Sequence, residues 1–166
     1  MPDLIPLGII IRPAVREDAS AIRALVRGEH LNPLGLDWRN FLVAEDSAGR
    51  LAAIGAVKTH GDGSRELASI ATVPDARGRG AASAVIRAIL ARAESAAAGK
   101  PLYLTCRHSM KGFYEAFGFR EIGTGEMPPY FRRLYGLFSV MSRLAGKENR
   151  LTVMMGLDFG FINRRP

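Results

Sequence analysis

The sequence has a single cysteine and no long apolar segment. Cys106 has no second thiol to pair with, so the chain cannot form an internal disulfide, and a reducing compartment is expected. No apolar run reaches the length of a membrane-spanning helix, and the first residues lack the basic start and apolar stretch of a signal peptide. We therefore predict a cytoplasmic protein that does not associate with a membrane.

Histidine is also scarce. His30, His60 and His108 are not spaced as metal ligands, and Cys106 belongs to no cysteine–histidine pattern, so no metal site is predicted. We interpret Cys106 as a buried thiol on a strand and expect no cysteine nucleophile.

Basic residues outnumber acidic ones by 23 to 16, which gives a net charge of +7. Such an excess predicts attraction to a polyanion: nucleic acid, acidic lipid or a phosphorylated cofactor. The length of 166 residues, of which 48% are hydrophobic and 23% charged, is typical of one globular domain with its own core. The charge thus restricts the partner and leaves the fold open.

Hydrophobic periodicity alternates between that of strands and that of helices. A buried strand is predicted at 9–11, with further strands at 41–44, 51–59, 66–73, 102–106, from 119 onward, and at 151–157. Helices are predicted at 18–28, 81–97, 111–117 and 129–144, with one helical turn near Trp38. This alternation predicts the α/β class, a mixed sheet with helices on both faces, in one domain over 1–166.

A glycine-rich segment, Arg77-Gly78-Arg79-Gly80, joins the strand at 66–73 to the helix at 81–97. Unpaired N–H groups and the helix dipole attract phosphate at a helix start, and glycines let phosphate oxygens approach the backbone. The segment is not a P-loop, which needs Gly-Lys-Ser/Thr, nor a dinucleotide fingerprint, whose third glycine is missing. By itself it fits either a phosphate cradle or an ordinary turn with solvated arginines.

Three segments together resemble one known family. Arg77 to Ala82 has the form Arg/Gln-x-x-Gly-x-Gly/Ala and follows the turn Thr72-Val73-Pro74-Asp75. Phe113 to Arg120 is similar to a second signature, Phe-Tyr-Glu-x-x-Gly-Phe, and Ile11 to Ala14 with Asp18-Ala19 resembles a first strand and helix. In this order and spacing, the region from Ile9 to about Ile122 resembles the GNAT superfamily of acyl-CoA-dependent N-acyltransferases. The resemblance implies the GNAT fold, with a mixed, mostly antiparallel central sheet.

The resemblance also implies a site for acetyl-CoA, used as co-substrate. In that family the pantetheine arm pairs with the splayed edge of the strand before the loop, which assigns backbone contacts to Ile70, Ala71 and Thr72. The backbone amides from Gly78 to Ser83, a stretch that includes Arg79, Gly80, Ala81 and Ala82, would hold the pyrophosphate, beside the charges of Arg77 and Arg79. Thr72 stands where the family usually has valine, a departure that backbone contacts should survive. Ser109 lies where an Asn or Ser often touches the cofactor.

Tyr114 is the residue that we predict for chemistry. When an amine attacks the thioester, CoA leaves as a thiolate, and a phenol can stabilise it with a hydrogen bond or pass it a proton. The resemblance implies that this tyrosine lies near the sulfur. The alternative is an aromatic side chain that only packs into the core.

Glu66 is the second catalytic candidate, as the base. An alkylamine with a pKa of about 10.4 is mostly protonated at neutral pH and cannot attack until a base removes the proton. Several relatives place a base on this strand, but an ordinary carboxylate is weakly basic, so burial or a water relay would be needed. The alternatives are a solvated glutamate at a hairpin end, or His108 as the proton acceptor.

The stretch 127–150 has no counterpart in the resemblance. Within its predicted helix, Tyr130, Leu134, Leu137, Met141 and Leu144 repeat at helical spacing; Phe131, Tyr135 and Phe138 widen the apolar face, and Arg132 and Arg143 lie opposite. This helix could pack on the sheet as core, cover the acceptor site as a lid, or form a homodimer contact. A basic tail, 163–165, follows the last strand.

We predict an enzyme that transfers acetyl from acetyl-CoA to a primary amine by direct attack in a ternary complex. The amine could be a small molecule or an amine of a protein. A non-catalytic acyl-CoA-binding regulator is the alternative. A nucleic-acid-binding module is disfavoured, because the arginines are scattered and no stacking aromatic motif is present.

Overall fold

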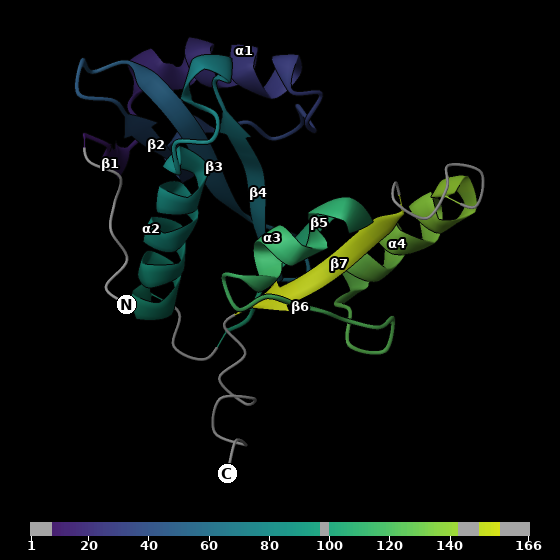
Figure 1. Ribbon diagram of the computed structural model, residues 1–166. Coiled ribbons are helices and arrows are strands. Elements are labelled where there is room, and N and C mark those ends of the chain that lie inside the picture. Colours follow the sequence, from purple (N-terminus) through teal and green to yellow (C-terminus); the bar gives the residue numbers. More distant parts are fainter. Residues whose placement is uncertain (1–7, 97–99, 143–149, 157–166) are drawn as a thin grey trace. The chain divides into compact units, whose positions relative to one another are not determined.

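The computed structural model describes residues 8–96, 100–142 and 150–156 (Figure 1). The chain groups into two compact units. The first comprises Met1–Val57 and Leu67–Arg92, and the second comprises Lys58–Glu66 and Ala93–Pro166. The single domain that the sequence predicts stays a prediction.

Hydrogen-bonded strands follow the order β1-β2-β3-β4-β5-β7-β6. The first unit contains β1 (Ile10–Pro13), β2 (Phe41–Glu45), most of β3 (Leu51–Thr59) and most of β4 (Arg65–Thr72). Its helices are α1 (Ala19–Gly28) and α2 (Ala81–Ala96), with 3-10 turns at Arg16–Asp18, Trp38–Asn40 and Pro74–Ala76. These elements begin and end within a few residues of the predicted ones.

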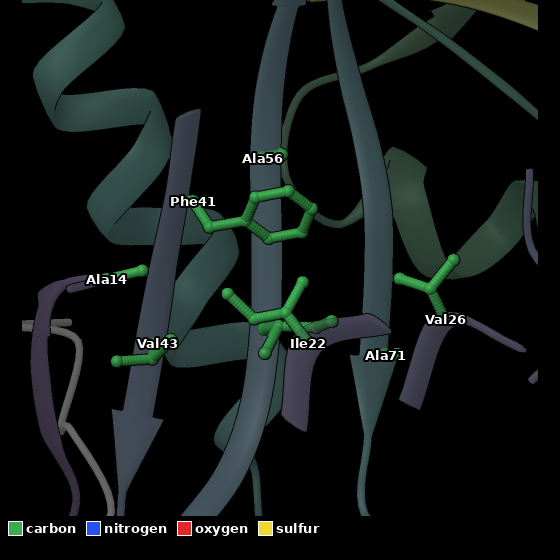
Figure 2. Close-up of a cluster of buried hydrophobic side chains, with 8 residues drawn as sticks. Ala14, Ile22, Val26, Phe41, Val43, Ala56 and Ala71 are labelled. Atoms are coloured by element: carbon green, nitrogen blue, oxygen red, sulfur yellow. The ribbon is translucent and has the colours of Figure 1, made fainter. Parts of the chain in front are cut away.

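Helix α1 covers one face of these strands. Ile22 and Val26 are four residues apart, so they lie on the same side of the helix, and both are buried. They pack against Phe41, Ile54 and other inward-facing side chains of β2, β3 and β4. Figure 2 shows Ile22 and Val26 lying over the strands of this cluster.

Helix α2 covers the opposite face, because side chains alternate along β3. Ile54 faces the α1 cluster, and Gly55 faces the other way. A Cβ atom on Gly55 would lie 2.6 Å from Ile70 Cδ1, 2.7 Å from Val85 Cγ1 and 3.0 Å from Ile89 Cδ1. Helices on both faces are thus confirmed within the first unit, and the close approach of α2 requires glycine at position 55.

Strand β1 is not the buried strand that the sequence predicts. Ile10 is 60% exposed, although Ile11 is half-buried. The reason is position: among the described strands, β1 pairs with β2 alone and forms the edge of the sheet. Pro13, which has no N–H to donate, suits an edge strand.

The second unit is built around β5 (Leu102–Arg107) and β7 (Leu151–Gly156), which pair antiparallel over six residues each. The first two residues of β4, Arg65 and Glu66, pair parallel with Leu102 and Tyr103. The short strand β6 (Arg120–Glu121) pairs antiparallel with β7. The last described strand therefore lies between two strands that precede it in sequence. Its helices are α3 (Lys111–Glu115), after a 3-10 turn at His108–Met110, and α4 (Pro129–Ser142).

Helix α4 packs into a core through the first residues of its predicted apolar face: Tyr130 of the stripe, with Phe131 and Tyr135 beside it. Phe131 is fully buried against Tyr103, Val153 and Met155. Leu137, a member of the predicted stripe, is 67% exposed, and Phe138 is also exposed. The aromatic residues nearest the start of α4 supply the buried face, because the start of the helix is where it meets β5 and β7.

Some predicted features lie outside the described residues: Arg143 and Leu144 at the end of the helix, Leu157 at the end of the last strand, and the tail at 163–165. The same holds for the side chain of Met141. Among the helices that the structure describes, none has the length and apolar character needed to cross a bilayer.

Candidate functional site

The loop between β4 and α2 has the backbone of a phosphate cradle. Gly78 and Gly80 have φ values of 73° and 78°, in the left-handed region that glycine adopts without strain. The first hydrogen bond of α2 runs from Ala84 N–H to the Gly80 carbonyl, at 3.0 Å. The amides of Ala81, Ala82 and Ser83 precede that bond, so they have no partner within the helix. They are available to an anion at the start of a 16-residue helix.

The two loop arginines differ in their surroundings. Arg77 forms an ion pair with Glu29, which follows α1. Arg79 lines a hollow of about 360 Å³, together with Arg50, Asp46 and Asp75. The loop therefore carries positive charge from Arg79, while the charge of Arg77 is balanced by a carboxylate.

The predicted pantetheine strand contains a backbone irregularity that the sequence does not reveal. Ser69 has a φ of 55°, which is uncommon for a residue other than glycine. Ile70, Ala71 and Thr72 follow it directly and form the end of β4. A left-handed residue within a strand interrupts the regular ladder and redirects the backbone groups beside it. Serine is not a marker for this conformation, so sequence reasoning could not find it.

Tyr114 lies on α3, half-buried among aromatic rings. Its ring makes edge contacts with Phe113, at 5.1 Å between centroids, and with Phe119, at 6.3 Å. Burial, followed by the proximity of Cys106, raises the pKa of Tyr114 to about 12. The phenol is therefore protonated throughout the neutral and mildly alkaline range, and it can donate a hydrogen bond.

Cys106 lies on β5, partly buried, with its sulfur 3.8 Å from Met154 Sδ. Burial, with a smaller contribution from Glu121, raises the pKa of the thiol to about 11. A neutral thiol is a poor nucleophile, so this environment agrees with the structural role predicted for Cys106.

Glu66 is not the solvated glutamate that was the alternative interpretation. Its Oε2 atom lies 2.9 Å from His60 Nε2, and Thr105 Oγ1 donates to its Oε1 atom at 3.5 Å. The side chains of His60 and Glu66 are only 13% and 12% exposed. The His60 ring stacks on Tyr130, with 3.5 Å between centroids and 12° between planes, and meets the edge of Phe131. The structure therefore joins Glu66 to a histidine for which sequence reasoning predicted no role.

The turn between β3 and β4 is held to the start of α4 by one carboxylate. Asp62 Oδ2 accepts a hydrogen bond from the backbone N–H of Tyr130, at 2.8 Å, and Oδ1 accepts from the hydroxyl and the N–H of Ser64. These hydrogen bonds, that of the Ser64 hydroxyl first, lower the pKa of Asp62 to about 2. Asp62 thus caps α4 from 68 residues away in sequence and brings His60 and Tyr130 together.

A hollow of about 580 Å³ lies beside this turn, on the exposed side of α4. Leu134 and Leu137 line it with Asp62 and Arg133. Leu134 and Leu137 of the predicted stripe therefore border open space, as a lid over an acceptor site would require.

The remaining sequence candidates, His108 and Ser109, lie in the 3-10 turn that follows β5. His108 Nδ1 lies 3.2 Å from Thr152 Oγ1, on β7. Ser109 is exposed in the 3-10 turn that precedes α3. Across the described part of the chain, no three His, Cys, Asp or Glu side chains are grouped as metal ligands.

Comparison with known proteins shows the family. Residues 37–121 match the model of the acetyltransferase (GNAT) domain. The chain is 36% identical over 124 residues to glucosamine 6-phosphate N-acetyltransferase 1 of Oryza sativa subsp. japonica; the match covers 69% of this chain and 73% of the relative.

Solved structures agree in fold. N-acetylglutamate synthase from Neisseria gonorrhoeae, complexed with coenzyme A and N-acetyl-glutamate, has a TM-score of 0.67 and 21% identity over 89% of this chain and 34% of its own. A Mycobacterium tuberculosis protein in complex with CoA and NLQ has a TM-score of 0.66 and 20% identity over 88% of this chain and 97% of its own. This chain thus spans about a third of the length of the synthase.

Proposed function

The chain belongs to the GNAT family of acetyltransferases and is an acetyl-CoA-dependent N-acetyltransferase; from this premise we propose that it transfers acetyl to a primary amine by direct attack in a ternary complex. The observation that carries the proposal is the backbone of the β4–α2 loop, where Gly78 and Gly80 are left-handed and the first amides of α2 are open to a phosphate. The single cysteine is compatible with the cytoplasmic location that the sequence predicts.

The β4–α2 loop would bind the pyrophosphate of the cofactor. The amides of Gly78 and Gly80, together with those of Ala81–Ser83, would supply N–H donors. The Arg79 amide donates to the Ala76 carbonyl at 3.4 Å, so Arg79 would contribute chiefly its charge. Ile70, Ala71 and Thr72 would contact the pantetheine arm through their backbone, with Ser69 turning the strand just before them. Ser109 is the remaining candidate for a cofactor contact.

Tyr114 would stabilise the leaving thiolate by donating a hydrogen bond. Its pKa of about 12 lies well above that of an ordinary thiol, about 8.5, so full transfer of its own proton to the thiolate would be uphill. The amine nitrogen, which must lose a second proton as the amide forms, is the better proton source for the thiol. Tyr114 therefore acts by holding negative charge on sulfur.

Glu66 would remove the first proton of the amine. An ammonium group cannot attack the thioester, because its nitrogen has no lone pair. Glu66 is largely shielded from solvent and is held by His60 and Thr105, as a positioned base requires. Free amine then attacks the carbonyl carbon, the C–S bond breaks and the amide forms.

The acceptor is the open part of the proposal. The rice relative is named for glucosamine 6-phosphate, and the Neisseria synthase was solved with N-acetyl-glutamate. We therefore propose a small polar molecule with a primary amine as the first class to screen.

The loop can be tested by calorimetric titration of the full chain with acetyl-CoA. We expect Gly80→Val to weaken binding by at least about thirtyfold, because a branched residue is strained at φ 78° and its side chain intrudes on the cradle. Gly35→Ala is the matched control: its φ of 67° is also left-handed, but nothing lies near its Cβ position. If the two variants bound acetyl-CoA with equal affinity, the loop would not be part of the binding site.

Activity is measured as release of CoA thiol with glucosamine 6-phosphate, glutamate and glutamine as acceptors. Thiol release that depends on one of these amines, with the acetylated amine as product, supports the proposal. Acetyl-CoA binding without acetylation of a small amine or a lysine-containing peptide would contradict it.

A further inference from the structure

We propose that His60 is a proton-relay and positioning residue for acetyl transfer. It receives, through Glu66, the proton that the amine loses. This inference rests on the proposed function, in which Glu66 is the base. His60 precedes the β3–β4 turn, six residues before Glu66, and the two side chains meet at 2.9 Å.

The geometry favours a relay over a surface ion pair. Both side chains are nearly buried, so the hydrogen bond between them is not exchanged freely with water. Stacking on Tyr130 and the edge of Phe131 fixes the plane of the imidazole. With Nε2 engaged by Glu66, Nδ1 has no hydrogen bond within the described part of the chain. One nitrogen is therefore tied to the carboxylate, and the other can pass a proton onward.

The groups around the imidazole come from three elements. Glu66 faces it from β4, and Tyr130 faces it from α4. Burial, followed by the negative charges of Glu66 and Asp62, raises the pKa of Tyr130, so this phenol stays neutral and presents a π face to the ring. Thr105 from β5 and Phe131 from α4 are uncharged.

The relay accounts for each proton that the reaction moves. The ammonium form of the acceptor gives one proton to Glu66, and the resulting amine attacks the thioester carbonyl. The C–S bond breaks, and the second nitrogen proton goes to the CoA sulfur. The first proton passes from Glu66 to Nε2 of His60, in the tautomer that carries its hydrogen on Nδ1, and the resulting imidazolium releases the Nδ1 proton to solvent. One ammonium and one acetyl-CoA thus yield one amide, one thiol and one proton.

The test is the pH dependence of kcat/KM for His60→Gln, with the most active amine of the acceptor screen as substrate. A relay matters only while the amine is protonated, so we expect a loss of tenfold or more at pH 7 that shrinks to within about threefold above the pKa of the amine. A loss that is the same at every pH would mean a structural role and would overturn the inference. His30→Asn is the control, since it removes another imidazole and asparagine tolerates the φ of 54° at that position.

Two further variants separate a proton relay from a purely structural role of His60. His60→Phe keeps a ring to stack on Tyr130 but has no nitrogen, so the same pH-dependent loss is expected even if His60→Gln fails to fold. In the double variant Glu66→Gln/His60→Gln, the second substitution should cost nothing more, because the relay acts through Glu66. Additive losses would refute the relay. A wild-type chain that acetylates no amine would instead overturn the proposed function, so the two failures are distinguishable.

Discussion

At the scale of single residues, surroundings determine the chemistry of each side chain. Tyr114 and Cys106 lie close together on α3 and β5, and burial keeps both uncharged. Glu66 has different surroundings, in which His60 and Thr105 support its carboxylate. The second unit thus holds a neutral hydroxyl donor and a carboxylate with two partners, the two groups that the proposed mechanism uses.

Replacing Tyr114 with Phe removes the donor and leaves the ring. We expect kcat to fall by about tenfold to hundredfold with little change in acetyl-CoA affinity, because the hydrogen bond is made to the thiolate of the transition state. Tyr135→Phe is the control. It makes the same change on α4, where Tyr135 packs against the core, and should leave kcat within about twofold.

The pH profile gives a second measurement of the same residue. A phenol with a pKa of about 12 remains a donor below that pH, so the titration of Tyr114 should cause no decline in the wild-type rate near pH 10. A decline near pH 10 that disappears in Tyr114→Phe would contradict the assigned environment.

At the scale of elements, close approach decides which residues are allowed. Helix α2 lies against β3 at Gly55, and Phe119 lies against β7 at Gly156, where a Cβ atom would come within 2.8 Å of the ring. Both glycines lie within strands, where glycine is otherwise unfavourable. Packing between elements therefore overrides the preference of a strand for residues other than glycine.

Gly55→Ala should lower the free energy of unfolding by about 1–3 kcal/mol, because the added methyl overlaps Ile70 and Val85. Urea denaturation followed by circular dichroism measures the change. Gly112→Ala on α3 is the control: no atom lies within 4 Å of its Cβ position, and alanine favours a helix, so it should be neutral or stabilising. Equal stability of Gly55→Ala and wild type would show that α2 can move away from β3 without loss.

At the scale of the whole molecule, several acidic side chains accept hydrogen bonds from neighbouring groups, although the net charge of the chain is +7. Hydrogen bonds lower the pKa of several carboxyls: Asp18 beside Arg12, Asp62 beside Ser64 and Tyr130, Glu121 beside Lys111, and Glu126 beside Arg120. Each folded-state pKa lies below its unfolded value, so each group stabilises the fold above the unfolded pKa of about 4 and loses that effect as pH falls through the folded pKa.

The free energy of unfolding should therefore decrease as pH falls below about 4, and the contribution of Asp62 should be lost as pH approaches about 2. Urea denaturation at pH 2 to 7 measures this dependence. Asp62→Asn cannot ionise, so its stability should depend less steeply on pH below 4 than that of the wild type. Identical slopes would mean that Asp62 does not hold α4 as the structure indicates.

How much the sequence predicts depends on the range of the interactions involved. The β4–α2 cradle is local: glycines at 78 and 80 and a helix start at 81 are contiguous, and the structure has them in the predicted form. The Glu66–His60–Tyr130 cluster is not local. It depends on Asp62 reaching the N–H of Tyr130, and no local pattern encodes a cap 68 residues distant.

The sequence by itself determined the secondary elements and the glycine-rich turn, because periodicity, capping and turn chemistry act over a few neighbouring residues. Its motifs, from Arg77 to Ala82 and from Phe113 to Arg120, carried the resemblance to the family. Only the tertiary structure decided that β1 is an exposed edge, that β7 lies between β5 and β6, and that Phe131 rather than Leu137 is the buried anchor of α4. It also decided that His60 supports Glu66. These features depend on which surfaces meet once strands pair, and pairing between distant segments follows from burial and hydrogen bonding across the whole unit rather than from any local stretch.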